Sequence, residues 1–586
     1  MQVLTDGLAN LDAAGLSEDH AVALDPALAD QVEVIRGPAT LLYGSGAAGG
    51  LVNVVTNRLH DAVPDGTHGL VELRGDTALG ERAAAGRLDA GLGQRVALHV
   101  DGLWRETDDY RIPGFAQSRR LRAEEIAEGE EPGDMRGKVD NSASRTHAGG
   151  IGLSYVGTDW MLGLAYSRYD TRYGIPAGHE HHGHEGEEEE EHEDEEGDLF
   201  IDMKQDRLDL AARFGLTAFG GAVLRLRGAA SDYEHAEVEP DGEVGTLYQM
   251  EGRELRAALD HGDRGGRYGT VGLQWQQADL FAEGEEAFIP DSRTRTLGLF
   301  AFQKRDFDAL SVELGLRWDR QEIAGAGLPG YDDRALNGSL GLSWQATERV
   351  ALVSHLVRSE RHPSATELYA DGPHAATRQF EVGDEDLRTE RGVTADLGLR
   401  LVAVREGGEL RAFASRYDGY IFLSPTGEEE DELPVFEYLQ RDARFHGFEA
   451  ELELPLGADS GFALALTGDY VRGRLTGDGG DLPRIPPLRL GAKLSWARGP
   501  YRAALGVQHH FEQDRVTETE LPTDAFTLVD AEFSWRPGWG GRDTLLFLRG
   551  RNLLDEDARV HSSPLKDDLP RRGRSLRAGV RMGFGR

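Results

Sequence analysis

One segment of the chain concentrates side chains that bind metal ions. HEHHGHEGEEEEEHEDEEGD, residues 179–198, holds five histidines and twelve acidic residues. Imidazole suits zinc, copper and nickel, and the interleaved carboxylates add oxygen ligands and a negative field. An acidic run can also be a solvated, disordered charged segment. The histidine density favours metal capture, and the expected ligands are His179, His181, His182, His184 and His192.

The sulfur content of the chain narrows the choice of metal. The sequence has no cysteine and only six methionines, which disfavours cuprous ion because that ion prefers soft sulfur ligands. Zinc is therefore the first expectation, and nickel or cupric copper stays open. The missing cysteines also exclude a disulfide framework and a cysteine nucleophile.

Enzymatic chemistry has no support in the sequence. No Ser-His-Asp set, pair of catalytic carboxylates or H-E-x-x-H motif stands out, so we expect no catalysis and no cofactor beyond a bound or transported metal. Gly44, Gly46 and Gly49 have the G-x-G-x-x-G spacing of a dinucleotide site. That site requires a helix after the glycines, whereas the residues that follow, LVNVVTN, are strand-like.

The elements that would position these residues are predicted to be long β-strands. In LSVELGLRWD, residues 310–319, apolar side chains alternate with polar and charged ones, and residues 393–401 and 95–104 repeat the pattern. Segments of roughly 10 residues with this period suit tilted membrane-barrel strands. From about Gly69 onward we count about 22 such segments, so the predicted fold is an all-β, antiparallel transmembrane β-barrel.

Loop lengths and charge support the barrel. Short turns alternate with long polar stretches at residues 105–145, 173–199, 362–391 and 425–438, an asymmetry typical of outer-membrane barrels. The formal net charge of −39 argues against a nucleic-acid partner and favours cations. The charge-free run Gly37–Asn57 holds five glycines, Pro38 and Asn53, so it is a poor membrane helix.

A glycine-rich segment near the start closely resembles the plug signature of TonB-dependent outer-membrane receptors. This segment is VEVIRGPATLLYGSGAAGGLVNVVTNR, Val32 to Arg58. The resemblance implies a plug over residues 1–62 and a barrel over residues 63–586, with Arg36 pairing to carboxylates on the inner barrel face. Family plugs exceed a hundred residues and follow a signal peptide and a TonB box. We therefore expect a partial plug, with the signal peptide and the coupling segment absent from this chain.

Two further segments resemble the zinc-uptake branch of this family, the ZnuD-like receptors. They are RSERHPSATELYADGPHAATRQFEVGDEDLRTER, residues 358–391, and GEEAFIPDSRTRTLGLF, residues 284–300. In that branch an Asp-His pair on the plug binds zinc, and SEDH supplies Asp19 and His20. The barrel ligands implied by position are Glu286 and His374, which would complete a tetrahedral shell.

The expected function is zinc import across the bacterial outer membrane. The acidic, histidine-rich segment would capture the ion, Asp19 and His20 would hold it more tightly, and the TonB–ExbB–ExbD complex would supply the work. Two alternatives stay open, a siderophore or haem receptor of the same family and a metal-binding or adhesion barrel that transports nothing. Of the remaining histidines, His355 is expected in barrel packing, and the adjacent His509 and His510 face opposite sides of a strand and cannot chelate one ion.

Overall fold

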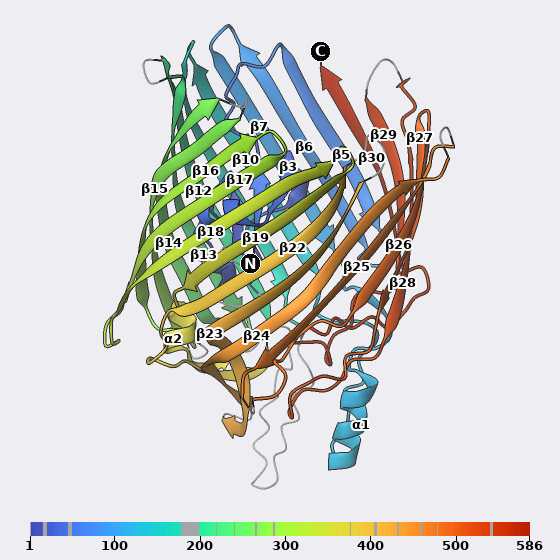
Figure 1. The fold of residues 1–586 in the computed structure, drawn as a ribbon. Helices are drawn as coiled ribbons and strands as arrows, with labels where there is room; N and C mark the ends of the chain where they lie inside the picture. The colour runs from blue at the N-terminus through green and yellow to red at the C-terminus, as the bar shows by residue number, and fades with distance from the viewer. Residues whose placement is uncertain are drawn as a thin grey trace.

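A computed structural model gives the fold of the chain (Figure 1). It describes residues 2–15, 20–44, 50–176, 199–217, 220–239, 241–263, 266–284, 287–374, 377–402, 407–430, 433–457, 460–477, 479–539 and 543–585. No helix in these ranges is both long enough and apolar enough to cross a membrane.

Within the described ranges, twenty-two antiparallel strands close into one barrel, as the alternation predicted. Each strand pairs with the next, β19 pairs directly with β22, and the last strand, β30, pairs with the first, β5. The barrel strands are β5 (Thr67–Asp76), β6 (Glu81–Leu92), β7 (Val96–Thr107), β10 (Ser144–Val156), β11 (Trp160–Gly174), β12 (Phe200–Leu216), β13 (Ala222–Val238), β14 (Val244–Asp263), β15 (Arg267–Gly284), β16 (Ser292–Phe307), β17 (Leu310–Ala324), β18 (Tyr331–Thr347), β19 (Val350–Arg361), β22 (Glu390–Val402), β23 (Gly407–Glu430), β24 (Leu433–Pro455), β25 (Phe462–Leu475), β26 (Arg489–Arg498), β27 (Tyr501–His510), β28 (Phe526–Trp535), β29 (Thr544–Arg551) and β30 (Ser575–Gly585).

Side-chain alternation in β17 shows how the sequence builds the barrel wall. Leu314 and Leu316 are more than half exposed on the outer surface, whereas Arg317 and Asp319 are fully buried on the inner surface. The Arg317 Nε donates to both carboxylate oxygens of Asp319, at 2.8 and 2.9 Å, and its Nη1 donates to the carbonyl of Leu42. The outer face therefore suits lipid, while the inner face holds charges that contact the N-terminal segment.

That N-terminal segment forms a small plug inside the barrel (blue in Figure 1). Its four-stranded sheet has the order β2-β1-β4-β3, with β1 and β4 parallel. Its elements are β1 (Gln2–Thr5), β2 (Leu8–Ala9), η1 (Ala13–Gly15), η2 (Pro26–Leu28), β3 (Gln31–Ile35), η3 (Pro38–Leu42) and β4 (Leu51–Val55). Arg36 donates to the Glu449 carboxylate of β24 at 2.5 Å, so the expected contact between the plug arginine and an inner-face carboxylate is present.

The two rims of the barrel differ in the length of their connections. One rim carries tight turns such as residues 93–95 and 157–159, and the opposite rim carries the long connections. The long connections contain β8 (Arg111–Phe115), α1 (Arg119–Glu128), β9 (Arg136–Lys138), α2 (Ala365–Tyr369), β20 (Asp371–His374) and β21 (Gln379–Val382). We call these the short-turn rim and the long-loop rim.

One predicted loop is largely strand. Residues 425–438 were expected to be a polar loop, but β23 and β24 continue through their described residues as a paired hairpin. The acidic residues of this hairpin hide the apolar–polar alternation by which a strand is recognised in a sequence. Beyond the lipid, neither face of a hairpin has to be apolar.

Candidate metal site

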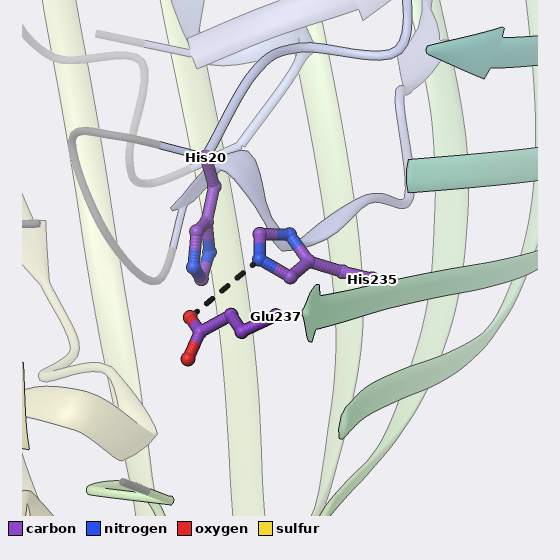
Figure 2. A group of neighbouring side chains, drawn as sticks. All are labelled: His20, His235 and Glu237. Atoms are coloured by element: carbon purple, nitrogen blue, oxygen red, sulfur yellow. Dashed lines mark ion pairs between the residues drawn. The ribbon is translucent and has the colours of Figure 1, made fainter. Parts of the chain in front are cut away.

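Three ligand side chains meet where the plug touches the barrel wall near the long-loop rim (Figure 2). His20 comes from the plug, and His235 and Glu237 come from the end of β13. One ligand atom from each of these residues lies within 4.8 Å of the other two. The ring centroids of His20 and His235 are 4.3 Å apart, and His235 Nε2 lies 3.7 Å from Glu237 Oε1.

The neighbours of the two histidines orient their rings. His20 Nδ1 lies 3.2 Å from the carbonyl oxygen of Ala13, and because a carbonyl only accepts, this nitrogen donates. His20 Nε2 is then the nitrogen with the metal-binding lone pair. Tyr233 Oη lies 3.2 Å from His235 Nδ1, which leaves Nε2 of His235 directed towards Glu237. Such support of the second ring nitrogen is typical of histidines that bind metals.

The surroundings of the site are largely apolar. His20, His235 and Glu237 are at most 6% exposed, and they lie within a cluster that includes Tyr233 and Tyr248. The Tyr248 ring centroid lies 5.6 Å from that of His20 and 5.8 Å from that of His235. Excluding water strengthens the electrostatic attraction between a cation and the Glu237 carboxylate.

His374, predicted as a barrel ligand, lies beside this cluster. It is buried at the end of β20, with its ring centroid 6.4 Å from that of His20. Its Nδ1 lies 3.0 Å from Glu381 Oε1 and 2.9 Å from Thr377 Oγ1, and its ring stacks on Phe288. The structure thus brings His20 and His374 close together, and whether His374 binds metal stays a prediction.

The other predicted ligands fall outside the described residues. These are Asp19, Glu286, His179, His181, His182, His184 and His192. Described residues flank the histidine-rich segment, since Gly174 of β11 pairs with Phe200 of β12. Phe200 in turn pairs with Val238, the residue after Glu237, so the described residues on either side of this segment lie on the rim above the candidate site.

His235 and Glu237 were not anticipated as ligands. The signal that could have found them is their spacing, because two residues apart on a strand means the same face, here the inner one. The sequence pattern alone does not bring β13 to the plug. The contact with His20 depends on the tertiary packing of the plug inside the barrel.

The remaining histidines singled out in the sequence lie elsewhere. His355 packs in the wall as expected, with Nδ1 3.0 Å from the Asp396 carboxylate. His509 Nδ1 lies 2.9 Å from Thr527 Oγ1, whereas the His510 ring stacks on Phe526 at 4.3 Å. These two adjacent residues therefore have different neighbours, in line with their opposite orientation on β27.

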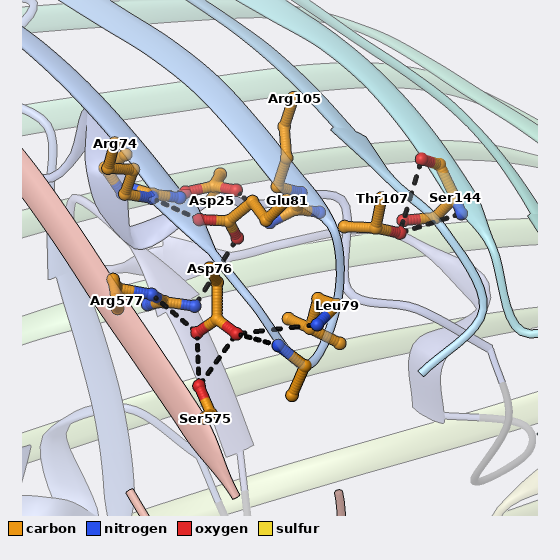
Figure 3. Close-up of polar contacts among 12 residues, drawn as sticks. Asp25, Arg74, Asp76, Leu79, Glu81, Arg105, Thr107, Ser144, Ser575 and Arg577 are labelled. Carbon is orange, nitrogen blue, oxygen red and sulfur yellow. Dashed lines mark hydrogen bonds and ion pairs between the residues drawn. The ribbon is translucent and has the colours of Figure 1, made fainter. Parts of the chain in front are cut away.

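Two neighbouring sets of polar contacts join the plug to β7 and the closing strand β30 to β5 (Figure 3). Arg105 of β7 donates to Asp25, the N-cap of η2, at 2.5 Å. Asp76 of β5 accepts from Ser575 Oγ at 2.7 Å and from Arg577 Nε at 3.2 Å, both on β30. The first contact ties the plug to β7, and the other two tie together the pair of strands that closes the barrel.

A cavity of about 220 Å³ lies next to these contacts and is rich in arginine. Its lining includes Arg549, Arg551, Arg571, Arg572 and Arg577, together with Asp76 and Asp530. Burial and the neighbouring cations Arg577 and Arg571 lower the pKa of Arg572 below its ordinary value. The crowding of cations in a partly enclosed space suits an anionic ligand.

Comparisons with known proteins agree with this architecture. Residues 136–553 match the family described as "TonB dependent receptor-like, beta-barrel", and residues 1–51 match "TonB-dependent Receptor Plug Domain". The Rhizobactin receptor of Rhizobium meliloti (strain 1021) is 23% identical over 638 residues, which cover 95% of this chain and 80% of that receptor. The Hemin receptor of Yersinia pestis is 39% identical over 64 residues, 11% of this chain and 10% of that receptor.

Solved structures share the fold over the whole chain. "Copper transporter OprC" gives a TM-score of 0.78 at 17% identity and covers 100% of this chain and 91% of its own. The FrpB iron transporter from Neisseria meningitidis (F3-3 variant) gives 0.75 at 14% identity, with 100% and 91% coverage. The family match over residues 136–553, together with the plug inside a closed 22-stranded barrel, shows that the chain belongs to the TonB-dependent receptors, transporters of the bacterial outer membrane that catalyse no reaction.

Proposed function

We propose that the protein imports zinc across the outer membrane, and that His20, His235 and Glu237 hold the ion during transport. The observation that carries the proposal is the meeting of a plug histidine with a barrel histidine and a barrel carboxylate in a buried site. Two imidazoles and one carboxylate are typical zinc ligands, and three protein ligands leave one position for Asp19 or water. The absence of cysteine argues against a thiolate site for a softer ion.

The route begins at the extracellular surface. By the usual asymmetry of such barrels, the long-loop rim faces outward. The histidine-rich segment 177–198 collects divalent ions there, and its flanking residues lie on the rim above the His20 site. The ligands of the His20 site come from two folded parts of the protein. Binding zinc there therefore costs less conformational entropy than binding it to the histidine-rich segment, and the His20 site holds zinc more tightly than that segment. TonB then remodels the plug, which separates His20 from His235 and Glu237 and releases the ion inward.

Uptake of radiolabelled zinc by cells tests this proposal. Cells expressing the receptor should accumulate zinc at a rate that falls at least tenfold in His20→Ala and in His235→Ala. His509→Gln, which changes a histidine of β27 instead of β13, should transport zinc like the parent. Equal uptake by the parent and both alanine variants, at equal receptor abundance in the membrane, would refute zinc import through this site.

A second candidate function is uptake of an anionic metal chelate, and the arginine-lined cavity favours it. Relatives carry names that refer to rhizobactin, hemin, iron and copper, so chelated metals occur among the cargoes of the family. Competition decides between the two functions. If an excess of a carboxylate-bearing ferric chelate abolishes zinc uptake and is itself accumulated, and Arg571→Ala removes both effects, the chelate is the preferred cargo.

A further inference from the structure

A second group of histidine and aspartate side chains lies where the plug passes into the barrel wall. His60 belongs to the segment between β4 and β5, Asp89 to β6 and His99 to β7. His60 Nε2 lies 2.8 Å from Asp89 Oδ1, and His99 Nδ1 lies 2.7 Å from the same oxygen. All three residues are at most 9% exposed.

This group is distinct from the His20 site and lies towards the other rim. Asp89 and His99 are direct partners across β6 and β7, close to the short turn at residues 93–95. His235 and Glu237, in contrast, stand at the long-loop end of β13. An ion that left the His20 site for the periplasm would move towards the short-turn rim, and the His60 group lies near that rim.

A carboxylate behind His99 gives this group the features of a metal site. His99 Nε2 lies 3.0 Å from Asp101 Oδ2, and Arg58 donates to both Asp101 oxygens at 2.7 and 2.9 Å. Asp101 thereby keeps the proton on His99 Nε2 and directs Nδ1 towards Asp89. Carboxylate support of the far ring nitrogen is the usual arrangement behind a metal-binding histidine.

Two glycines of β10 let the segment that carries His60 lie directly against the barrel wall. A Cβ at Gly152 of β10 would lie 2.0 Å from the Arg58 carbonyl oxygen, and one at Gly150 would lie 2.5 Å from Arg58 Nε. The His60 backbone N–H also donates to Ser154 Oγ at 2.9 Å. The glycines permit this close approach, so His60 is held against the wall by more than its contact with Asp89.

We propose that His60, Asp89 and His99 form a second divalent metal site, which fastens the end of the plug to the barrel. The metal takes His60 Nε2, one Asp89 oxygen and His99 Nδ1. Because the Asp89 carboxylate only accepts, both of these nitrogens carry a proton before the metal binds. The proton of His99 Nδ1 leaves to solvent while Nε2 keeps its proton and its bond to Asp101, and the proton on His60 Nε2 leaves to solvent while Nδ1 carries the ring proton. Zinc-ligand bonds of about 2.0–2.2 Å place two ligands roughly 3.3 Å apart, so the present 2.7 and 2.8 Å separations have to widen by about half an ångström. Three protein ligands, one fewer than in a structural zinc site, suit an ion that later departs.

The choice of zinc as a probe rests on the proposed function. The site itself is inferred from the contacts of His60, Asp89 and His99 and does not depend on that function. The experiment counts ions held by the detergent-solubilised full chain after equilibrium dialysis, in a background where the five histidines of residues 179–198 are changed to serine. Cobalt replaces zinc in a parallel series, because its visible absorption reports tetrahedral nitrogen and oxygen ligands.

The expected count is two tightly held ions for the background, one for His60→Gln, one for His20→Ala and none for the double variant. His509→Gln, as a matched histidine substitution, should keep two. A count that His60→Gln leaves unchanged in a folded, heat-modifiable barrel overturns the second site. If His20→Ala still holds two ions while His60→Gln holds one, the proposed zinc site at His20 is overturned and the His60 site is supported.

If His60→Gln does not fold, the His20→Ala chain alone decides the question. Zinc should raise the temperature at which its heat-modifiable gel mobility is lost, because the remaining site joins plug and barrel. No shift in that temperature, together with no cobalt absorption, contradicts the proposal. Asp89→Asn in the same chain should abolish both signals.

Discussion

His20 of the plug and His235 of the barrel face each other with ring centroids 4.3 Å apart, although they come from distant parts of the chain. Neither residue could hold an ion tightly in its own element alone. The two rings lie together only while the plug is seated, so ion binding at this position and plug position are linked. Any movement that withdraws His20 must therefore weaken the site.

The close passage of the plug over β10 predicts a strong effect of a single methyl group. Gly152→Ala places a Cβ 2.0 Å from the Arg58 carbonyl oxygen, so the plug segment or the strand has to shift. Overpacking of this kind costs about 1–3 kcal/mol, and the thermal midpoint of the heat-modifiable gel shift should fall. Gly338→Ala is the control, since the nearest atom to its Cβ is 4.0 Å away. Equal midpoints for the two variants would contradict the described packing.

The last strand predicts a role for its terminal aromatic residue. Phe584 of β30 is the cross-strand partner of Gly69 in β5, and its exposed ring lies over that glycine. Aromatic cover of a strand glycine stabilises the pair that closes the barrel. Phe584→Ala should lower the yield of folded barrel in outer membranes by several-fold. Phe533→Ala removes a similarly exposed ring within β28, and an equal loss of yield there would remove the special role of Phe584.

The histidine-rich segment predicts weak, pH-sensitive binding of several ions. A peptide of residues 177–198 should bind more than one zinc ion, with affinity that falls below about pH 6.5 because free histidines become protonated. Calorimetry at about pH 5 and about pH 7.5, on either side of that pKa, measures the effect. Identical affinities at both values would mean that carboxylates alone bind the metal.

Because His362, just beyond β19, is buried, we expect the structure around it to lose stability in acid. Burial lowers the pKa of His362 and outweighs the nearby carboxylates of Asp319, Asp333 and Glu360, which raise it. The opened form, with an ordinary pKa of about 6.5, binds the proton more readily than the closed form. The contribution of neutral His362 to the stability of the closed form is therefore complete above about pH 6.5. It is lost as the pH falls through the lower pKa that His362 has in the closed form.

Hydrogen exchange at residues 377–389 measures this effect, since Thr389 Oγ1 lies 3.3 Å from His362 Nδ1. Protection, corrected for the intrinsic pH dependence of exchange, should decrease between about pH 6.5 and pH 5. His362→Gln should remove that decrease. A decrease of the same size in the variant would assign it to another group.

The fold could be predicted from the sequence because lipid imposes alternation on every strand. The pattern at residues 310–319 correctly separated Leu314 and Leu316 from Arg317 and Asp319, and the glycine-rich segment correctly indicated a plug with Arg36 on an inner carboxylate. The prediction was wrong at residues 425–438, where the hairpin extends past the lipid and the alternation ends.

The candidate site could be predicted only in part. His20 followed from the resemblance to zinc-uptake receptors, and His374 lies beside it. His235 and Glu237 escaped notice because their approach to His20 is set by how the plug sits in the barrel, which no local pattern encodes. Asp19 and Glu286 stay predictions.

The most direct test of the central claim is anomalous diffraction at the zinc edge from crystals of the zinc-loaded chain. We expect a peak about 2.0–2.2 Å from ligand atoms of His20, His235 and Glu237, and its loss in His20→Ala. Zinc peaks confined to other positions in the parent, with none between the plug histidine and β13, would contradict the account.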